Sequence, residues 1–131
     1  MCARLRRKRL FEISAELGCN KLALGHNKDD IIESLFLNMC YSGEISTMKP
    51  FMPMFDGEIT IIRPLAFVEE KHTRRFAQIH NFPEFINPCP SAEISQRKTI
   101  KNFLAQLYQN NKTIKGNIFR SLRNVKTDYL L

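Results

Sequence analysis

Residues 21–38, KLALGHNKDDIIESLFLN, decide the fold of this chain. The apolar run at 21–24 is typical of a short strand, and Gly25-His26-Asn27 interrupts it. After Asp29 and Asp30, apolar residues recur at the spacing of a helix face. These apolar residues are Ile32, Leu35, Phe36 and Met39. The stretch therefore predicts a strand, a turn and a helix, in that order.

The two aspartates at the start of the predicted helix have two chemical explanations. The first residues of a helix present unpaired N–H groups and a positive dipole end, which attract phosphate. Asp29 and Asp30 would repel a bare phosphate unless a divalent cation or a separate basic group lies between them. Asp at a helix start is equally well explained by capping, because a carboxylate accepts hydrogen bonds from those N–H groups. The residues alone leave a ligand site and an ordinary cap both open.

The composition bounds the class of protein. The 131 residues, 44% hydrophobic and 25% charged, are typical of one globular domain. No apolar run is long enough to span a membrane, and no signal region follows the basic N-terminal residues, so we expect a cytoplasmic protein without a membrane partner. The net charge of +7 favours a polyanionic partner such as RNA, although a basic surface with no specific partner gives the same charge.

Basic residues gather in two places. Five lie at positions 4–9, at the start of a helix predicted over 3–17 and ended by Gly18, where they oppose the helix dipole. A nearby anion explains this cluster, and so does an arbitrary basic surface. Eight basic residues and no acidic one lie at 96–126, which makes this segment the better candidate for phosphate contacts. Tyr108 or Phe119 could stack on bases there, and for Phe119 we favour a core position.

The rest of the chain predicts further elements. Residues 42–57 contain several prolines and glycines and are predicted as a loop whose Met and Phe side chains pack in the core. A second strand is predicted at 58–62, so two strands, each followed by a helix, indicate an α/β fold with a parallel pair. In the helix after this strand, Phe76 and Ile79 are expected to face inward. The predicted C-terminal helices cover 69–80, a segment starting at Ser91, and 114–125.

The four cysteines are Cys2, Cys19, Cys40 and Cys89. No two of them are spaced as C-x-x-C, and a cytoplasmic chain is not expected to carry disulfides. Spacing alone favours four reduced thiols over a metal site. Cys2 and Cys89 differ from the others in context, because one precedes the arginine-rich helix and the other lies in a proline-rich loop. Both settings stabilise thiolates.

The block at 24–30, LGHNKDD, resembles the LGHNxDD motif of the PP-loop (N-type) ATP pyrophosphatases. Within that superfamily the chain is similar to the C-terminal part of the tRNA 2-thiocytidine synthetases. The similarity runs almost from end to end, through CARLRR, ALGHNKDD with LFLN, IIRPLAF, FPEFINPCPSAEISQR and Asn124-Val125. It implies a partial PP-loop fold, Rossmann-like and adenine nucleotide alpha hydrolase-like, with a short parallel sheet and a helical C-terminal region. Residues 1–90 would form the ATPase-like portion, and 91–131 a basic helical extension packed on it.

The resemblance also implies a reaction with its cofactors and partners. In such enzymes ATP adenylates a cytidine of the tRNA anticodon loop, releasing pyrophosphate, and a sulfur donor then displaces AMP. We therefore expect tRNA thiolation that uses ATP, Mg²⁺ and a 4Fe-4S cluster. The expected partners are tRNA and a sulfur donor such as a cysteine desulfurase.

The expected site residues follow from the same resemblance. The nucleotide site is expected at Gly25, His26, Asp29 and Asp30. Asp30 also matches the catalytic acid and metal region, while Arg6 and Arg7 fall where related thiolases place a basic residue near the reacting phosphates. Cys2 and Cys89 match two of the three thiolates that hold the cluster and leave one iron open.

The chain departs from the family pattern in two respects. The phosphate loop SGGxDS is absent, and the first cysteine of the C-x-x-C pair that Cys2 would complete is missing, so the chain lacks a third cluster ligand. Two alternatives therefore stay open, namely a noncatalytic RNA-binding or assembly fragment and another PP-loop ligase such as a lysidine synthetase. A sheet without its first strands exposes an edge and an apolar face, so we also expect self-association as a homodimer.

Overall fold

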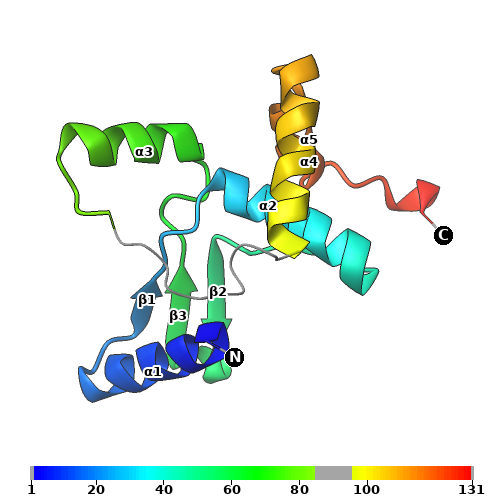
Figure 1. The fold of residues 1–131 in the computed structure, drawn as a ribbon. Coiled ribbons are helices and arrows are strands. Elements are labelled where there is room, and N and C mark those ends of the chain that lie inside the picture. Colours follow the sequence, from blue (N-terminus) through cyan, green and yellow to red (C-terminus); the bar gives the residue numbers. More distant parts are fainter. Residues whose placement is uncertain (1, 85–95, 131) are drawn as a thin grey trace. The chain divides into compact units, whose positions relative to one another are not determined.

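The computed structural model describes residues 2–84 and 96–130, and it is drawn as a ribbon in Figure 1. The chain divides into two compact units. One unit contains residues 1–31 and 48–90, and the other contains residues 32–47 and 91–131. Helix α2 (Lys28–Leu37) begins in the first unit and continues into the second. The division into domains 1–90 and 91–131 stays a prediction.

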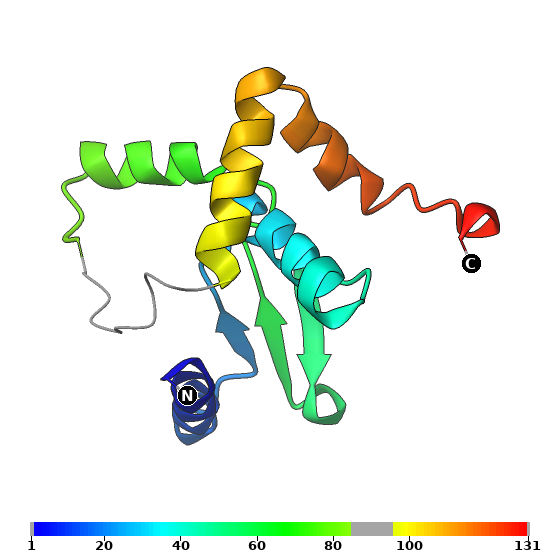
Figure 2. The same ribbon diagram turned by 45° about the vertical axis from the view of Figure 1, so that its right-hand side comes forward.

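The first unit is built on a three-stranded sheet. The strand order is β1 (Lys21–Ala23), β3 (Ile59–Ile62) and β2 (Phe51–Met54). β1 pairs with β3 in parallel, with Leu22 opposite Ile61, whereas β2 pairs with β3 antiparallel (Figures 1 and 2). Along β3, Ile59 and Ile61 are buried, as the alternation of a strand with one core face requires. The α/β class and the parallel pair are therefore confirmed.

Strand β2 lies in the segment that the sequence predicted as a loop, so that prediction was wrong for residues 51–54. The error comes from Pro53, because proline lacks an N–H group and usually interrupts a ladder. At the edge of a sheet the missing N–H costs no ladder hydrogen bond, and β3 is the only described strand that pairs with β2. The predicted core packing also fails for two phenylalanines of this region, since Phe51 is 60% exposed and Phe55 is 57% exposed.

Helix α1 (Cys2–Glu16) packs beside β1 in the first unit. It ends before Gly18, whose φ of 65° is a left-handed conformation that glycine adopts without strain, as the sequence predicted. Phe11 on this helix meets Phe55 edge to face, with 5.4 Å between the ring centroids. This aromatic pair joins the helix to the turn between β2 and β3.

Helix α3 (Glu70–Ile79) matches the helix predicted over 69–80. The side chains expected to face inward do not do so, because Phe76 is 56% exposed and Ile79 is 64% exposed. Phe76 contacts two other rings of its own segment instead, His80 with centroids 4.2 Å apart and Phe82 with centroids 5.9 Å apart. The apolar residues of α3 thus form a local aromatic cluster.

The second unit is helical. Helices α4 (Gln96–Asn110) and α5 (Ile114–Ser121) form a hairpin, visible in Figure 2. Helix α2 continues as a π-helical turn over Asn38–Ser42, which Gly43 closes with a left-handed φ of 67°. The helix predicted from Ser91 is described from Gln96 onward, and its first predicted residues lie outside the described range. Helix α5 ends at Ser121, earlier than predicted.

The core of the second unit joins α2 to the hairpin. Its buried residues are Ile32, Ile100 and Leu104, with exposed fractions of 0%, 5% and 3%. Partly buried residues surround them, namely Phe36, Leu37, Leu107, Tyr108, Ile118 and Phe119. The core position predicted for Phe119 is confirmed, and Tyr108 shares that environment. Among the described helices, none combines the length and the apolar character that crossing a membrane requires.

We expect Ile32→Ala to lower the free energy of unfolding by about 2 to 5 kcal/mol, because it opens a cavity at a fully buried site. Urea denaturation followed by circular dichroism measures this change. Ile45→Ala is the matched control, since Ile45 belongs to the same unit but is 66% exposed. Equal losses in the two variants would show that Ile32 is not a core residue.

Candidate functional site

The carboxyl ends of the parallel strands β1 and β3 meet at one edge of the sheet (Figure 1). In open α/β sheets this edge is where ligands bind. Backbone hydrogen bonds join the two loops that leave it. The Leu24 N–H donates to the Ile62 carbonyl at 2.9 Å, and the Lys28 N–H donates to the Val68 carbonyl at 2.9 Å. The turn at 25–27 is thereby held against the segment that follows β3.

Asn27 caps helix α2. Its Oδ1 accepts hydrogen bonds from the N–H groups of Asp29, at 2.9 Å, and Asp30, at 3.2 Å. Oδ2 of Asp30 in turn accepts a hydrogen bond from the Asn27 N–H at 2.9 Å. This reciprocal arrangement is a capping box, built here from Asn and Asp, and it satisfies three N–H groups at the helix start.

Asp29 caps a different helix. Its Oδ2 accepts a hydrogen bond from the Glu70 N–H at 2.8 Å, at the first residue of α3. Glu69, the residue that precedes α3, makes no capping hydrogen bond through its own side chain. The carboxylate of Asp29 therefore supplies from another segment the acceptor that the α3 terminus needs. As a result, the starts of α2 and α3 are held together at the same edge of the sheet.

The sequence left two explanations for Asp29 and Asp30 open, a ligand site and helix capping, and these contacts confirm the capping. Asp29 and Asp30 do serve as capping groups, since each carboxylate accepts a backbone N–H. A carboxylate has two oxygens and about four acceptor positions, so a cap does not use up its capacity for a further ligand. The predicted nucleotide-binding role of these residues stays a prediction.

Gly25 and His26 occupy the turn between β1 and the cap. Gly25 is exposed, and its φ does not require glycine. A Cβ atom built there would meet no atom of the described residues within 4 Å. Neither the backbone conformation nor the packing of this unit therefore accounts for a glycine at 25, and the space above it is open to a ligand.

Arg63, which the sequence analysis did not single out, is a buried cation at this edge. It follows the last residue of β3 and is 7% exposed. Its Nε donates to Nδ1 of His26 at 3.3 Å, and its Nη1 donates to the Lys49 carbonyl. Because Nδ1 of His26 accepts this bond, the proton of the neutral imidazole lies on Nε2. The available signal in the sequence was an arginine directly after the predicted strand at 58–62 and before Pro64.

Burial also acts on the charge of Arg63. Desolvation lowers the pKa of its guanidinium, since a cation loses solvation energy when it leaves water. The ordinary value is so high that the group keeps its charge at neutral pH. The edge of the sheet therefore combines one buried positive charge and two helix N-termini with the carboxylates of Asp29 and Asp30, and Glu69 and Glu70 lie at the start of α3. Such a mixture suits a phosphate group accompanied by a divalent cation.

Arg6 lies on the exposed side of helix α1. Neither Arg6 nor Arg7 has a carboxylate of the described residues within salt-bridge distance, whereas Arg9 pairs with Glu12 at 3.3 Å and Glu16 at 3.1 Å. No described hydrogen bond or ion pair joins Arg6 to the turn at 25–30. The structure thus brings Gly25, His26, Asp29 and Asp30 together and does not bring Arg6 to them. The expected catalytic role of Arg6 stays a prediction.

The expected cluster ligands lie outside what the structure describes. Cys2 is the first residue of α1, but its side chain is not among the described atoms, and Cys89 falls within residues 85–95. The described cysteines, Cys19 and Cys40, are exposed free thiols. Within residues 4–84 and 96–130, no group of three His, Cys, Asp or Glu side chains could hold a metal ion.

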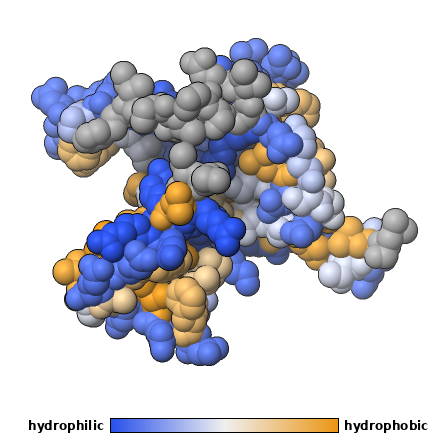
Figure 3. Space-filling view, turned by 60° about the horizontal axis from the view of Figure 1, so that its bottom comes forward, coloured by the Kyte–Doolittle hydropathy of each residue, from blue (hydrophilic) through white to orange (hydrophobic). Residues whose placement is uncertain are grey.

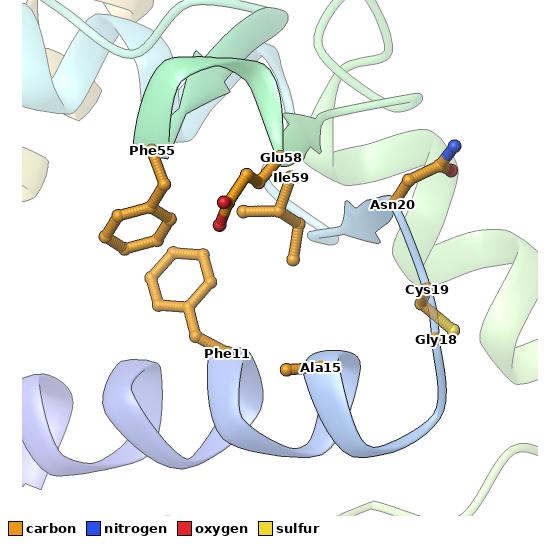
Figure 4. Close-up of a pocket in the computed structure, with 8 residues that line it drawn as sticks. All are labelled: Phe11, Ala15, Gly18, Cys19, Asn20, Phe55, Glu58 and Ile59. Carbon is orange, nitrogen blue, oxygen red and sulfur yellow. The ribbon is translucent and has the colours of Figure 1, made fainter.

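A separate pocket of about 380 Å³ lies at the opposite edge of the sheet, before β1 and β3. Figure 4 shows the rings of Phe11 and Phe55 at one end of it and Cys19 and Asn20 at the other. The side chains of Cys19 and Asn20 point away from its middle. This pocket lacks the helix starts and the buried cation of the carboxyl edge, so it is not part of the candidate site.

The chain is homologous over its whole length to curated bacterial proteins. It is 42% identical over 134 aligned residues to the tRNA-cytidine(32) 2-sulfurtransferase of Geobacter sulfurreducens and covers 52% of that protein. It is 46% identical to the protein of the same name from Herminiimonas arsenicoxydans and covers 42% of it. The chain thus spans about half the length of the curated relatives it matches. These matches confirm the resemblance on which the sequence analysis relied.

A solved structure supports the same relationship. The fold matches the U34-tRNA thiolase NcsA from Methanococcus maripaludis, a structure that includes its [4Fe-4S] cluster, with a TM-score of 0.73 and 25% sequence identity. The match covers 94% of this chain and 42% of that protein. A scan against models of known protein families finds no match for the chain.

We expect Arg63→Met to lower the free energy of unfolding by about 1.5 to 3 kcal/mol, because it removes a charged donor from His26 and from the Lys49 carbonyl. Thermal or urea denaturation measures the loss. The matched control is Arg75→Met on the exposed surface of α3, which should change stability by no more than about 0.5 kcal/mol. A stability of Arg63→Met equal to that of the control would contradict the role assigned to this cation.

Proposed function

We propose that this chain, a homologue of the tRNA-cytidine(32) 2-sulfurtransferases, is part of an enzyme that thiolates a cytidine in the tRNA anticodon loop at the expense of ATP. The observation that carries the proposal is homology over the whole of this chain, at 42–46% identity, to about half of each relative; the motif turn lies at the edge of the sheet where ligands of such folds bind. The similarity to a tRNA thiolase of known structure supports it. The proposed enzyme acts in the cytoplasm.

The residues at the carboxyl edge fit the proposed nucleotide site. The starts of α2 and α3 and the buried Arg63 supply positive potential for phosphate groups. Asp29 and Asp30 supply carboxylate oxygens, the ligand type that Mg²⁺ prefers, and Gly25 leaves room for the nucleotide. When bound there, ATP supplies the adenylyl group that activates the target base. The residues of this chain hold the phosphates and the cation, while Arg63 keeps His26 in one orientation.

Arg6 and Arg7 have a different proposed role. They are exposed cations without a described carboxylate partner, at a helix start whose dipole they oppose. An anion near them would offset this electrostatic cost. We assign Arg6 to the stabilisation of charge that develops on the reacting phosphates, as the family resemblance implies.

The sulfur chemistry is assigned to cysteines of this chain. Cys2 and Cys89 are the proposed ligands of a 4Fe-4S cluster, in agreement with the cluster of the structural relative. The family resemblance implies a third thiolate ligand beside these two. A cysteine desulfurase is the proposed source of the sulfur, and tRNA is the proposed substrate. A lysidine synthetase, the nearest alternative reaction, would need neither cysteine.

Anaerobic reconstitution with iron and sulfide tests this proposal. We expect the parent chain to bind iron and sulfide in cluster proportions, seen by iron quantitation and Mössbauer spectra, and we expect Cys2→Ala and Cys89→Ala to lose most of that iron. The matched controls are Cys19→Ala and Cys40→Ala, which remove exposed free thiols and should leave the iron content unchanged. Iron loss of the same size in all four variants, or no cluster in the parent, would count against the assignment.

Self-association is the second part of the proposal. Large apolar side chains are exposed in the first unit, including Phe51 and Phe55 near the edge strand β2, and Figure 3 shows hydrophobic surface among hydrophilic residues. An edge strand offers unpaired backbone groups to another strand. A second copy that covered this edge would bury both the phenylalanines and the backbone groups, so we propose a homodimer.

Light scattering at several concentrations tests the homodimer. The expected mass is twice the 15.3 kDa of the chain. Phe51→Glu should shift the equilibrium to the monomer, because it places a charge on the apolar edge. The control, Tyr129→Glu, changes an aromatic residue that is 86% exposed and should keep the dimer. A parent chain that stays monomeric at high concentration and binds no apolar dye would refute this part.

A further inference from the structure

The α4–α5 hairpin carries an unusual excess of positive charge. Between residues 96 and 126 the chain has eight basic residues and no acidic one. Helix α4 begins with basic residues and has no acidic residue in its first turn, so its charges oppose its dipole. Such a distribution does not stabilise the isolated hairpin. The contacts that each charged side chain makes must therefore explain this distribution of charge.

Two of the eight cations, although exposed themselves, pair with a buried carboxylate of the second unit. Glu33 of α2 is buried, with 7% of its side chain exposed, and it lies beside two side chains of α4. Arg97 Nη1 is 3.7 Å from its Oε2, and Lys101 Nζ is 3.9 Å from its Oε1. A buried carboxylate needs nearby positive charge, so Arg97 and Lys101 are explained by protein structure alone.

Three other cations have no such explanation. Lys112, Arg120 and Lys126 are exposed, and no carboxylate within the described part of the chain lies at salt-bridge distance from any of them. Arg120 Nη2 donates to Oδ1 of Asn117 at 2.9 Å, and the ammonium of Lys126 lies 5.9 Å from the ring centroid of Tyr129. These contacts orient the cations without neutralising them.

The outer side of α5 adds neutral polar groups to these charges. Asn117 and Arg120 lie three residues apart on α5, Asn124 follows the end of that helix, and all three are exposed. The Asn124 amide donates to the Arg120 carbonyl at 2.9 Å, which fixes its position just after the helix. The opposite side of α5 packs on the core through Ile118 and Phe119. The loop before α5, the helix itself and the segment after it therefore present ammonium, guanidinium and amide donors.

The aromatic residues of the hairpin restrict what this surface can recognise. Tyr108 and Phe119 both pack against the core, so neither ring is fully open to an unstacked base. Lys115 lies over the Tyr108 ring, 5.0 Å from its centroid, and covers it further. These two rings are only partly accessible to a base, whereas Phe103 of α4 is 46% exposed and Tyr129, beside Lys126, is 86% exposed. Stacking on such rings tolerates any base and reads no sequence. The available donors suit phosphates and ribose hydroxyls.

We infer that the α4–α5 hairpin and the segment just after it bind the sugar–phosphate backbone of RNA through Lys112, Arg120 and Lys126, without reading its sequence. The identity of the polyanion as RNA rests on the proposed function. The hairpin positions the RNA, while chemistry takes place elsewhere. Affinity at this surface depends on salt, because each neutralised phosphate releases counterions.

Fluorescence anisotropy with a labelled tRNA anticodon stem-loop tests this inference at several salt concentrations. The variant combines Lys112→Gln, Arg120→Gln and Lys126→Gln in the full chain. We expect its affinity to fall about tenfold or more, and the slope of log affinity against log salt to decrease by about 2 to 3. A stem-loop of unrelated sequence should bind equally well, since no base is read.

A second triple variant controls for net charge. Lys21→Gln, Lys71→Gln and Arg75→Gln remove the same charge from exposed positions of the first unit. This control should bind RNA with nearly the affinity of the parent, and circular dichroism should show both variants folded. Equal weakening by the two variants, unchanged binding by the hairpin variant, or no binding of RNA by the parent would each overturn the inference.

The RNA-binding test and the test of cluster formation can fail independently of each other. The hairpin variant keeps all four cysteines, so its iron content should equal that of the parent. An intact cluster with unaffected RNA binding would overturn the hairpin surface and leave the thiolase assignment in place. Hairpin-dependent RNA binding by a chain that forms no cluster would support the surface and contradict the thiolase assignment.

Discussion

The first unit depends on the hydrogen bonds that cap two helices at one edge of its sheet. Asn27 and Asp30 cap α2 reciprocally, and Asp29 caps α3 from outside that helix. A helix end leaves several N–H groups without partners, and leaving them unpaired in a protein interior is costly. Three polar residues within positions 27–30 meet this requirement for two helices at once. They also fix where the positive ends of both helices point.

The same contacts give the candidate site its electrostatic character. Capping carboxylates reduce the positive potential of the helix ends, whereas Arg63 restores it from within the protein. A guanidinium buried beside His26 cannot move far, so the charge is preorganised and not recruited on binding. The hairpin of the second unit shows the opposite arrangement, because its cations at Lys112 and Arg120 are exposed. Exposed cations suit a large and mobile polyanion better than a small ligand.

The errors in the predicted fold have a common physical origin. Pro53 predicts a loop because its missing N–H is costly in a central strand, yet β2 pairs with one described strand only, and at such an edge the cost disappears. Phe76 and Ile79 have the spacing of a buried helix face, yet both are exposed. Residue type and hydrophobic periodicity indicate which secondary structure a segment can form and which of its faces could be buried. They do not report whether a neighbour is present to pair with it or to cover it.

The sequence by itself determined the strand, turn and helix around the LGHNKDD block, the parallel pair and the relationship to tRNA thiolases, because these depend on local spacing and on residues adjacent in the chain. Only the tertiary structure decided that Asp29 caps α3 and that Arg63 is a buried partner of His26. These contacts join residues 41 and 37 positions apart. No periodicity encodes such pairs, since they form only when the strands bring their loops to the same edge.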